Sequence, residues 1–227
     1  MIEELRNQKI LFFCAHPDDD VFSSGALISH LSKNDNNITC VYLKSSPNGV
    51  ARDISIEEKI ELRKSEAVNS CRILGSKSLF LDLDQPTLEC NEENIGIVLD
   101  VLQGENPDIV FLPPPNDAHP THRTVNRIVL KALESFNVNE AWYYETWTPL
   151  AIPDYVFFFD EALMKVKIEA MKQYESQLER LDYVGSTVAL NVFRGIMGQE
   201  LMGGFGKSYQ NKAKYGEAFQ KVFNKTD

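Results

Sequence analysis

The feature that most constrains the fold of this sequence is a regular alternation of short apolar runs with amphipathic helical patterns. The first run, Lys9 to Ala15, is apolar at every position after Lys9, which is typical of a strand buried on both faces of a parallel sheet. Further strands are predicted at 38–43, 78–83, 108–112, 141–147 and 155–159, and helices at about 20–32, 56–74, 95–102, 121–136 and 161–181. This order predicts an α/β fold, a Rossmann-like open, mostly parallel sheet with helices on both faces.

Length and charge narrow the class of protein. The chain has 227 residues, 43% of them apolar, which suits one globular domain over residues 1–227. A net charge of −10 argues against nucleic acid as a partner and against a general affinity for anionic membranes. The apolar runs are too short to cross a bilayer, so we expect no integral membrane association. A homo-oligomer is compatible with this sequence.

Three further sequence features bear on location and flexibility. The N-terminus, Met1 to Glu4, is acidic and does not resemble a signal peptide. The four cysteines are widely spaced without a C-x-x-C motif, so we expect free thiols in a reducing compartment and a cytoplasmic protein. Residues 194–206 contain five glycines, and we expect a mobile loop there.

Two short polar motifs directly follow predicted strands and hold three of the four histidines. The first, AHPDDD, spans Ala15 to Asp20, and the second, NDAHPTHR, spans Asn116 to Arg123. Both lie at carboxyl ends of strands, which is the edge where open α/β sheets bind ligands. No G-x-G-x-x-G motif follows the first strand, so dinucleotide binding loses its main support.

The residue types and their spacing in these motifs favour a metal site. His16 and Asp19 are three residues apart across a turn into a helix, so both can face one point. His122 shares the apolar face of the later helix. Two imidazoles and one carboxylate leave a coordination position open, as in catalytic zinc sites, and the same triad can hold Fe(II). Asp18 would be aimed differently, where it can take a proton from a metal-bound water. The alternatives are helix capping by the aspartates and structural, hydrogen-bonded histidines.

Together the two motifs resemble A-H-P-D-D-E and H-P-D-H, the hallmarks of the PIG-L/LmbE-like family of metal-dependent de-N-acetylases. The resemblance extends over roughly the whole chain. Residues 63–67 and Leu74-Gly75 are similar to the family's R-x-x-E-A and L-G, and residues 144–147, 174–177 and 216–219 resemble further family segments.

The resemblance implies a set of roles. His16, Asp19 and His122 would hold the metal, which is zinc, although iron can occupy such sites. Asp18 would be the general base, and His119 would stabilise the oxyanion and protonate the leaving amine. The implied reaction is hydrolysis of an acetamido group, usually on an N-acetylglucosamine conjugate, so the partner is a small-molecule amino-sugar substrate.

The chain departs from the family pattern at two positions. Asp20 replaces the usual Glu, a shortening that we expect to change only a supporting or capping contact. Thr121 replaces the Asp of H-P-D-H, which in the family can support the catalytic histidine. Thr cannot stabilise an imidazolium by charge, and we hypothesise that Asp117 supports His119 instead.

Candidate substrate-binding residues are Arg63 and Asp84. Arg63 falls on the apolar stripe of its helix, where it either contacts a ligand or pairs with Glu66 at i+3. Asp84 follows the third strand and either accepts bonds from sugar hydroxyls or serves as a turn residue. Aromatic side chains suited to stacking on sugar rings, or to the core, are Trp142, Tyr143 and Trp147.

Two alternative functions remain open on the sequence. One is an amidase that removes another acyl group from a thiol or antibiotic-like conjugate, with the glycine-rich segment as a lid that sets the pocket shape. The other is a non-catalytic metal-binding module. Asp18 and His119 argue against the second, because a binding site alone needs neither.

Overall fold

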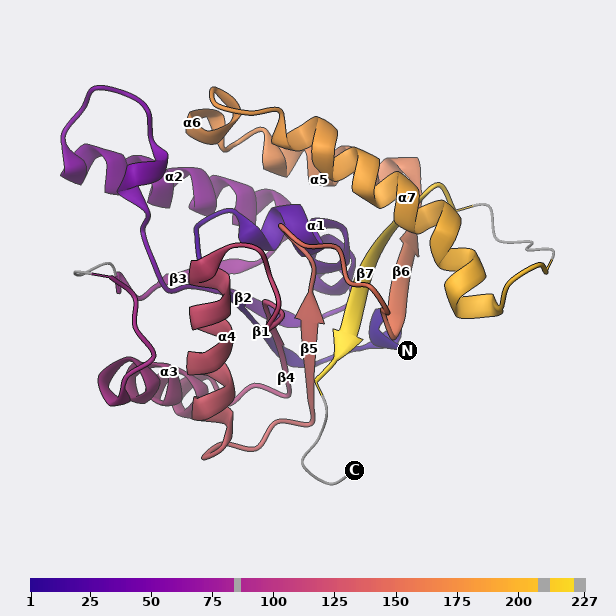
Figure 1. The fold of residues 1–227 in the computed structure, drawn as a ribbon, viewed down its shortest axis with the longest axis horizontal. Helices are drawn as coiled ribbons and strands as arrows, with labels where there is room; N and C mark the ends of the chain where they lie inside the picture. Colours follow the sequence, from indigo (N-terminus) through magenta and orange to yellow (C-terminus); the bar gives the residue numbers. More distant parts are fainter. Residues whose placement is uncertain (84–86, 208–212, 223–227) are drawn as a thin grey trace.

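The computed structural model describes residues 1–83, 87–207 and 213–222. Their strands form a seven-stranded sheet in the order β3-β2-β1-β4-β5-β7-β6 (Figure 1). The strands are β1 (Lys9–Cys14), β2 (Asn37–Tyr42), β3 (Lys77–Phe80), β4 (Ile109–Leu112), β5 (Glu140–Tyr144), β6 (Tyr155–Phe159) and β7 (Tyr215–Lys221). The first five are parallel, and β7 runs antiparallel to both of its neighbours. The predicted α/β fold with an open, mostly parallel sheet is confirmed.

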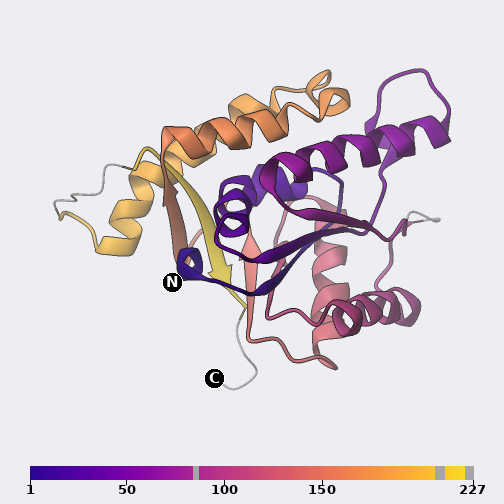
Figure 2. The same cartoon turned by 180° about the vertical axis from the view of Figure 1, so that it is seen from behind.

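Helices cover both faces of the sheet (Figures 1 and 2). They are α1 (Asp19–Ser32), α2 (Ile56–Leu74), α3 (Glu92–Glu105), α4 (Pro120–Leu133), α5 (Glu161–Met171), α6 (Glu175–Leu178) and α7 (Tyr183–Gly203), with 3₁₀ turns η1 (Ile2–Glu4) and η2 (Pro47–Gly49). Alternate residues of β1 point to opposite faces. Phe12 therefore packs in a core with α1, α2 and α5, and Phe13 packs in a second core with α3 and α4.

The C-terminal third differs from the prediction of a glycine-rich mobile loop at 194–206. Most of that segment is the second half of α7. Its glycines permit close packing: a Cβ on Gly195 would lie 2.3 Å from the Lys214 carbonyl oxygen, and one on Gly198 would lie 3.1 Å from Val156. The glycines bring α7 against β6 and β7, and they do not make the segment a loop.

Two other predictions about elements were wrong in detail. The helix expected over 161–181 is two helices, because the chain leaves the helical conformation at Tyr174, which has ψ 55°. The break lets Ser176 donate from its backbone N and its Oγ to Glu66, each at 2.8 Å, so a long-range contact overrides a continuous apolar pattern. The strand expected over 141–147 ends at Tyr144, which leaves Trp147 in a loop. Strand β7 was not predicted.

The structure bears on two expectations from the sequence, the lack of a membrane-spanning helix and the free state of the cysteines. Among residues 1–83, 87–207 and 213–222, no helix is both long and apolar enough to cross a bilayer. All four cysteines are free, and Cys14, Cys40 and Cys71 are buried.

Candidate metal centre

The two polar motifs meet at the carboxyl edge of the sheet, between β1 and β4. These strands are neighbours, and the chain continues from β1 toward β2 on one side and from β4 toward β5 on the other. His16 follows β1, and Asp19 opens α1. His122 lies in the first turn of α4, which follows β4. The position is the crevice where strand order reverses, as expected from the sequence.

Three candidate ligand side chains converge there. His16 Nδ1 and His122 Nε2 are 3.2 Å apart. Asp19 presents one carboxylate oxygen 3.2 Å from His122 Nε2 and the other 3.6 Å from His16 Nδ1. Ligands bound to a tetrahedral zinc at about 2.0–2.1 Å would lie about 3.3 Å from each other. The donor set therefore fits a small divalent cation in both chemistry and spacing. Two other groups that contain His16 are also compact enough to hold a metal, one with His119 and His122 and one with Asp18 and Asp19.

Backbone and charge hold this set in place. Asp19 Oδ2 accepts a hydrogen bond from the His16 backbone N at 2.9 Å, which locks the β1–α1 turn. Burial disfavours charge on both Asp19 and His122, but their mutual attraction prevails. It lowers the pKa of Asp19 well below its ordinary value and, together with Asp117, raises the pKa of His122 to about 10. The site is strongly attractive to positive charge.

Asp117 lies behind the candidate ligand His122. Its Oδ1 is 3.5 Å from His122 Nδ1, and the same oxygen accepts the His119 backbone N–H at 2.8 Å. Both His122 Nδ1 and Asp117 Oδ2 are buried without a hydrogen-bond partner. A carboxylate at the far nitrogen of a histidine is the arrangement that orients metal-ligating imidazoles. Asp117 contacts His119 through the backbone, and its carboxylate faces the ring of His122.

Asp18 is held by Arg63. Arg63 Nη2 donates to Asp18 Oδ2 at 2.9 Å, and the guanidinium is 3.7 Å from Glu66 and 5.9 Å from the centre of the Tyr174 ring. Arg63 is almost fully buried, pairs with Glu66 and borders the cavity, while its contact with a substrate stays a prediction. Its strongest contact is with Asp18, which the sequence did not indicate.

His119 is the N-cap of α4. Its Nδ1 accepts a hydrogen bond from the Thr121 backbone N at 3.2 Å. A neutral imidazole with Nδ1 as acceptor carries its proton on Nε2. Burial, with His16 and His122 nearby, lowers the pKa of His119 to about 4. The Thr121 backbone N–H thus holds His119 with its proton on Nε2.

The two remaining predicted positions have different outcomes. Asp20 is completely buried, neither of its carboxylate oxygens has a hydrogen-bond partner, and burial raises its pKa to about 7. It lies beside Cys40 and Cys71 under the site and does not line the cavity. Asp84 falls outside the described residues.

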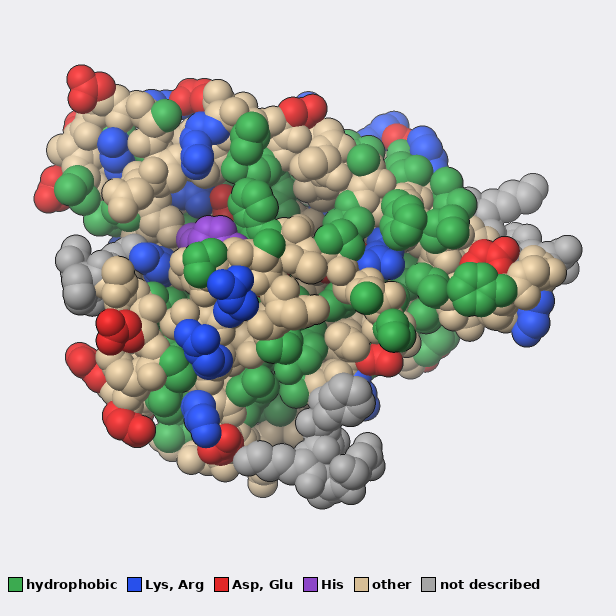
Figure 3. All heavy atoms as spheres, viewed as in Figure 1, with side chains coloured by type: hydrophobic (Ala, Val, Ile, Leu, Met, Phe, Trp, Pro, Cys, Tyr) green, Lys and Arg blue, Asp and Glu red, His purple; other side chains and the backbone are tan. Residues whose placement is uncertain are grey.

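A cavity of about 1090 Å³ opens over the candidate metal ligands, and Figure 3 shows histidine side chains (purple) reaching the surface. Trp147 is 48% exposed and lies 5.9 Å from the His119 ring and 6.2 Å from the Tyr183 ring, measured between centroids. The other two predicted aromatics are buried in the two cores. Lining residues that sequence reasoning missed are Phe22, Lys44, Arg180, Tyr183 and Thr187. No local motif marks them: Phe22 lies in α1, Lys44 follows β2, and the α6–α7 region reaches the site only through the fold.

The loop that carries Trp147 is anchored from α7. Arg194 donates to both carboxylate oxygens of Glu145, at 2.9 and 2.7 Å, and to the Leu150 carbonyl at 2.6 Å. Glu145 also accepts the Leu150 backbone N–H at 2.8 Å. All of these groups are buried, so the two ends of the 145–150 loop are fixed while Trp147 projects between them.

Comparison with known proteins gives one family and several similar folds. Residues 11–133 match the family model described as PIG-L: GlcNAc-PI de-N-acetylase. This region includes every predicted site residue.

Three solved structures illustrate the similarity of fold. The 4-carboxy-2-hydroxymuconate hydratase GalB from Pseudomonas putida is 17% identical, with a TM-score of 0.81 over 97% of this chain and 98% of that one. The conserved protein TT1542 from Thermus thermophilus is 20% identical, with a TM-score of 0.80 over 95% of each chain. The N,N'-diacetylchitobiose deacetylase from Pyrococcus horikoshii is 23% identical, with a TM-score of 0.77 over 95% of this chain and 84% of that one.

Proposed function

Because this chain belongs to the PIG-L family, we propose that it is a zinc-dependent hydrolase that removes the acetyl group from an N-acetylglucosamine-type sugar or sugar conjugate. The observation that carries the proposal is the convergence of His16, Asp19 and His122, with 3.2 and 3.6 Å between their ligand atoms, directly beside Asp18 and His119. Fe(II) is the alternative metal for this ligand set. Residues 1–227 would act as one catalytic domain.

His16, Asp19 and His122 would hold the metal, with Asp117 orienting His122. A bound metal of this kind polarises a carbonyl and makes water a stronger nucleophile at neutral pH. Side chains of the protein would carry out the proton transfers. Asp18 is not required as a ligand, and Arg63 fixes its orientation, so its free oxygen can take the proton from the attacking water.

His119 serves as the oxyanion donor. Its Nε2–H is available because Nδ1 is occupied by the Thr121 N–H. This donor is present before the reaction and needs no reorganisation when charge develops on the carbonyl oxygen. In this assignment His119 keeps its single proton on Nε2 for the oxyanion. We therefore assign both transfers to Asp18: it receives the water proton and passes it to the amine as the C–N bond breaks, which leaves acetate and a free amine.

The cavity supports a substrate larger than a single sugar. Its volume, about 1090 Å³, is at the upper end of the range for ligand pockets. Trp147 lies next to the rings of His119 and Tyr183, and both aromatic side chains line the cavity, where they would suit the apolar face of a sugar ring. Lys44 and Arg180 lie farther around the same cavity, where they would face the aglycone.

Other reactions that proteins of this fold carry out are alternatives to de-N-acetylation. A hydratase with the same fold shows that the architecture serves water chemistry beyond amide hydrolysis. An amidase acting on another acyl group would use the same residues. A cytoplasmic setting fits the free cysteines.

The test is acetate release from a panel of N-acetylglucosamine derivatives: free, 1-phosphate, nucleotide-linked and thiol- or inositol-linked. We expect release from at least one member, and loss of release in Asp18→Asn with metal content unchanged. Asp100→Asn, on the exposed side of α3, is the matched control. No release from any member by a metal-loaded protein, or full activity in Asp18→Asn, would overturn the proposal.

A further inference from the structure

A buried ion pair is inserted into the middle of α1 from α5 and β7, which both pack on that helix. Lys167 Nζ, on α5, lies 2.6 Å from Glu217 Oε1, on β7, and neither side chain is exposed to solvent. Glu217 accepts the backbone N–H groups of Ala26 and Leu27 at 2.9 and 2.8 Å. Lys167 donates to the Phe22 carbonyl at 3.0 Å. The pair therefore occupies one carbonyl and two N–H groups of the α1 backbone.

These backbone groups would bond to each other in a regular helix. In an uninterrupted α-helix the Ala26 N–H donates to the Phe22 carbonyl, four residues earlier, and the Leu27 N–H donates to the Ser23 carbonyl. A side chain inserted into this ladder of hydrogen bonds is one of the recognised causes of a bend in a helix. The insertion lies between the first turn of α1, residues 19–22, and the rest of the helix.

The sequence of α1 leaves room for the inserted side chain at Gly25. A Cβ at this position would lie 3.1 Å from Lys167 Cγ and 3.2 Å from Val21 Cγ2, which is closer than ordinary contact. Glycine is unfavourable in the interior of a helix because it loses more conformational freedom than other residues on folding. Its presence here is explained by the close approach of Lys167.

The first turn of α1 carries groups of the candidate metal centre. Asp19 offers its carboxylate to the two candidate histidine ligands, and Asp18 directly precedes it. Phe22, whose carbonyl accepts from Lys167, also lines the cavity. The ion pair thus contacts the backbone one helical turn from Asp19, on the buried side of the helix.

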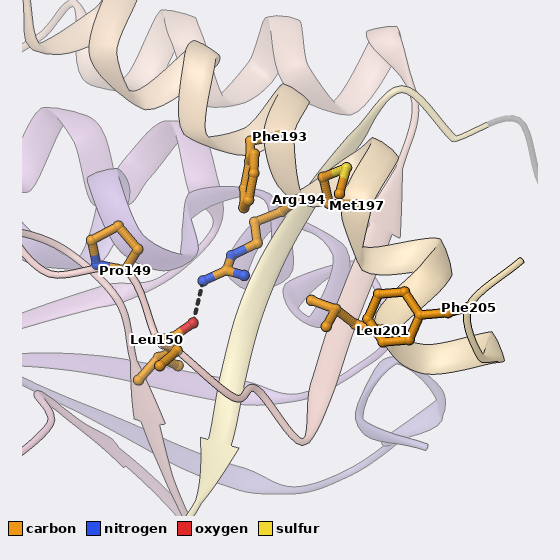
Figure 4. Close-up of a pocket in the computed structure, with 8 residues that line it drawn as sticks. Pro149, Leu150, Phe193, Arg194, Met197, Leu201 and Phe205 are labelled. Atoms are coloured by element: carbon orange, nitrogen blue, oxygen red, sulfur yellow. Dashed lines mark hydrogen bonds between the residues drawn. The ribbon is translucent and has the colours of Figure 1, made fainter.

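Stability alone does not explain a charged pair at this place. The cost of burying two opposite charges offsets much of their attraction, so apolar replacements of such pairs are often neutral or stabilising. Another buried pair, Arg194 with Glu145, fixes a loop, and Arg194 also donates to the Leu150 carbonyl (Figure 4). Glu217 and Lys167 make the same kind of backbone contact inside a helix, whose backbone groups have partners in one another.

We infer that Glu217 and Lys167 are positioning residues for the metal centre. By holding one turn of α1 open, they set the direction of the first turn and bring Asp19 to 3.2 Å from His122 Nε2. Without the pair, the freed N–H groups would bond back within the helix, and a regular α1 would direct its first turn elsewhere. A misplacement of about 1 Å, even from a change far from the chemistry, can cost about 10²-fold in rate. This inference rests on the proposed function, because it takes Asp19 as a metal ligand.

The test measures zinc affinity of the full chain by competition with a chelator, and kcat and KM on the best substrate of the panel. Lys167→Met/Glu217→Met removes both charges together, so that no unpaired charge is left buried. We expect zinc affinity to fall about 10–100-fold, and the zinc-saturated variant to have a lower kcat with KM little changed. Lys167→Met/Glu217→Gln keeps one acceptor for the α1 N–H groups and should recover part of both losses.

The matched control is the exposed ion pair of Lys214 with Glu161, 3.2 Å apart, which joins the residue before β7 to the start of α5. Glu161→Gln/Lys214→Met should bind zinc with unchanged affinity. Thermal unfolding is recorded for every variant, because a purely structural role would lower the unfolding midpoint and leave the zinc affinity of the folded protein unchanged. Should Lys167→Met/Glu217→Met not fold, Lys167→Met/Glu217→Gln carries the same test.

Zinc affinity and kcat equal to those of the unchanged protein in the folded variants would overturn the inference. An equal loss of zinc affinity in the control would overturn it too. Because zinc affinity is measured without substrate, the inference and the proposed reaction can fail separately. Weaker zinc binding in the variants, with no acetate release from any sugar by the unchanged protein, would overturn the proposed reaction and support the positioning role.

Discussion

Arg63 and Asp18, from two different helical regions, form a largely buried ion pair at the floor of the cavity, with 2.9 Å between Nη2 and Oδ2. The pair joins the middle of α2 to the residue that caps α1. Because Asp18 is the proposed proton carrier, this contact makes Arg63 a positioning residue that acts through Asp18.

Replacing Arg63 by Met should lower kcat about 10²-fold while KM changes little, because the carboxylate loses its orientation but the cavity keeps its shape. Steady-state kinetics checks this, with thermal unfolding as a control for folding. Arg63→Lys keeps the charge and should recover part of the lost kcat. A rise in KM with kcat unchanged would instead assign Arg63 to direct substrate binding.

Asp117→Asn should weaken metal binding about 10–100-fold, because the carboxylate facing His122 Nδ1 would become an uncharged amide. Competition with a chelator of known affinity measures the change. Asp100→Asn on α3 is the exposed control and should bind metal normally. Unchanged metal affinity together with slower turnover would favour the original hypothesis, in which Asp117 supports His119.

Trp147→Ala should raise KM about tenfold, since the sugar would lose its stacking surface beside His119. Metal content and the unfolding midpoint should stay close to those of the unchanged protein, because Trp147 is half exposed and its loop is anchored by Arg194. Trp147→Phe keeps an aromatic ring, so its KM should lie between that of the unchanged protein and that of Trp147→Ala. An unaltered KM for both variants would place the sugar elsewhere in the cavity.

Gly195→Ala should lower the free energy of unfolding by about 1–3 kcal/mol, because its Cβ would lie 2.3 Å from the Lys214 carbonyl oxygen. Chemical denaturation measures this. Gly96 in α3 is the matched control: a Cβ there has no neighbour within 4 Å, and Gly96→Ala should stabilise by about 0.5–1 kcal/mol. Equal effects of the two substitutions would contradict the packing role assigned to Gly195.

The sequence was informative where the candidate ligands lie near the end of a strand or in the helix that follows it. His16 and Asp19 follow β1 within a few residues and His122 lies in the helix that follows β4, so the strand order places all three at one edge. The unusual position of Arg63 on an apolar stripe was visible too. Its main partner was not, because Asp18 is 45 residues away and only the packing of α1 on α2 brings the two together.

Prediction from the sequence failed where one residue type serves two purposes. The glycine-rich composition of residues 194–206 is typical of a loop, yet two of these glycines are needed for close contact of α7 with β6 and β7. The break between α5 and α6 interrupts an unbroken apolar pattern, because Ser176 bonds to Glu66 from a distant helix. Similarly, the spacing of the motif did not show that the Asp117 carboxylate faces His122, because this depends on how the first turn of α4 is oriented.

The most direct test of the central claim is to titrate zinc into metal-stripped protein while acetate release is measured on the best substrate of the panel. We predict negligible release without metal, a rise in proportion to added zinc, and saturation at about one ion per chain, as expected for a single three-ligand site. The double variant His16→Ala/His122→Ala should release no acetate at any of these zinc concentrations. Release at full rate from the metal-stripped protein, or from that double variant, would contradict the account.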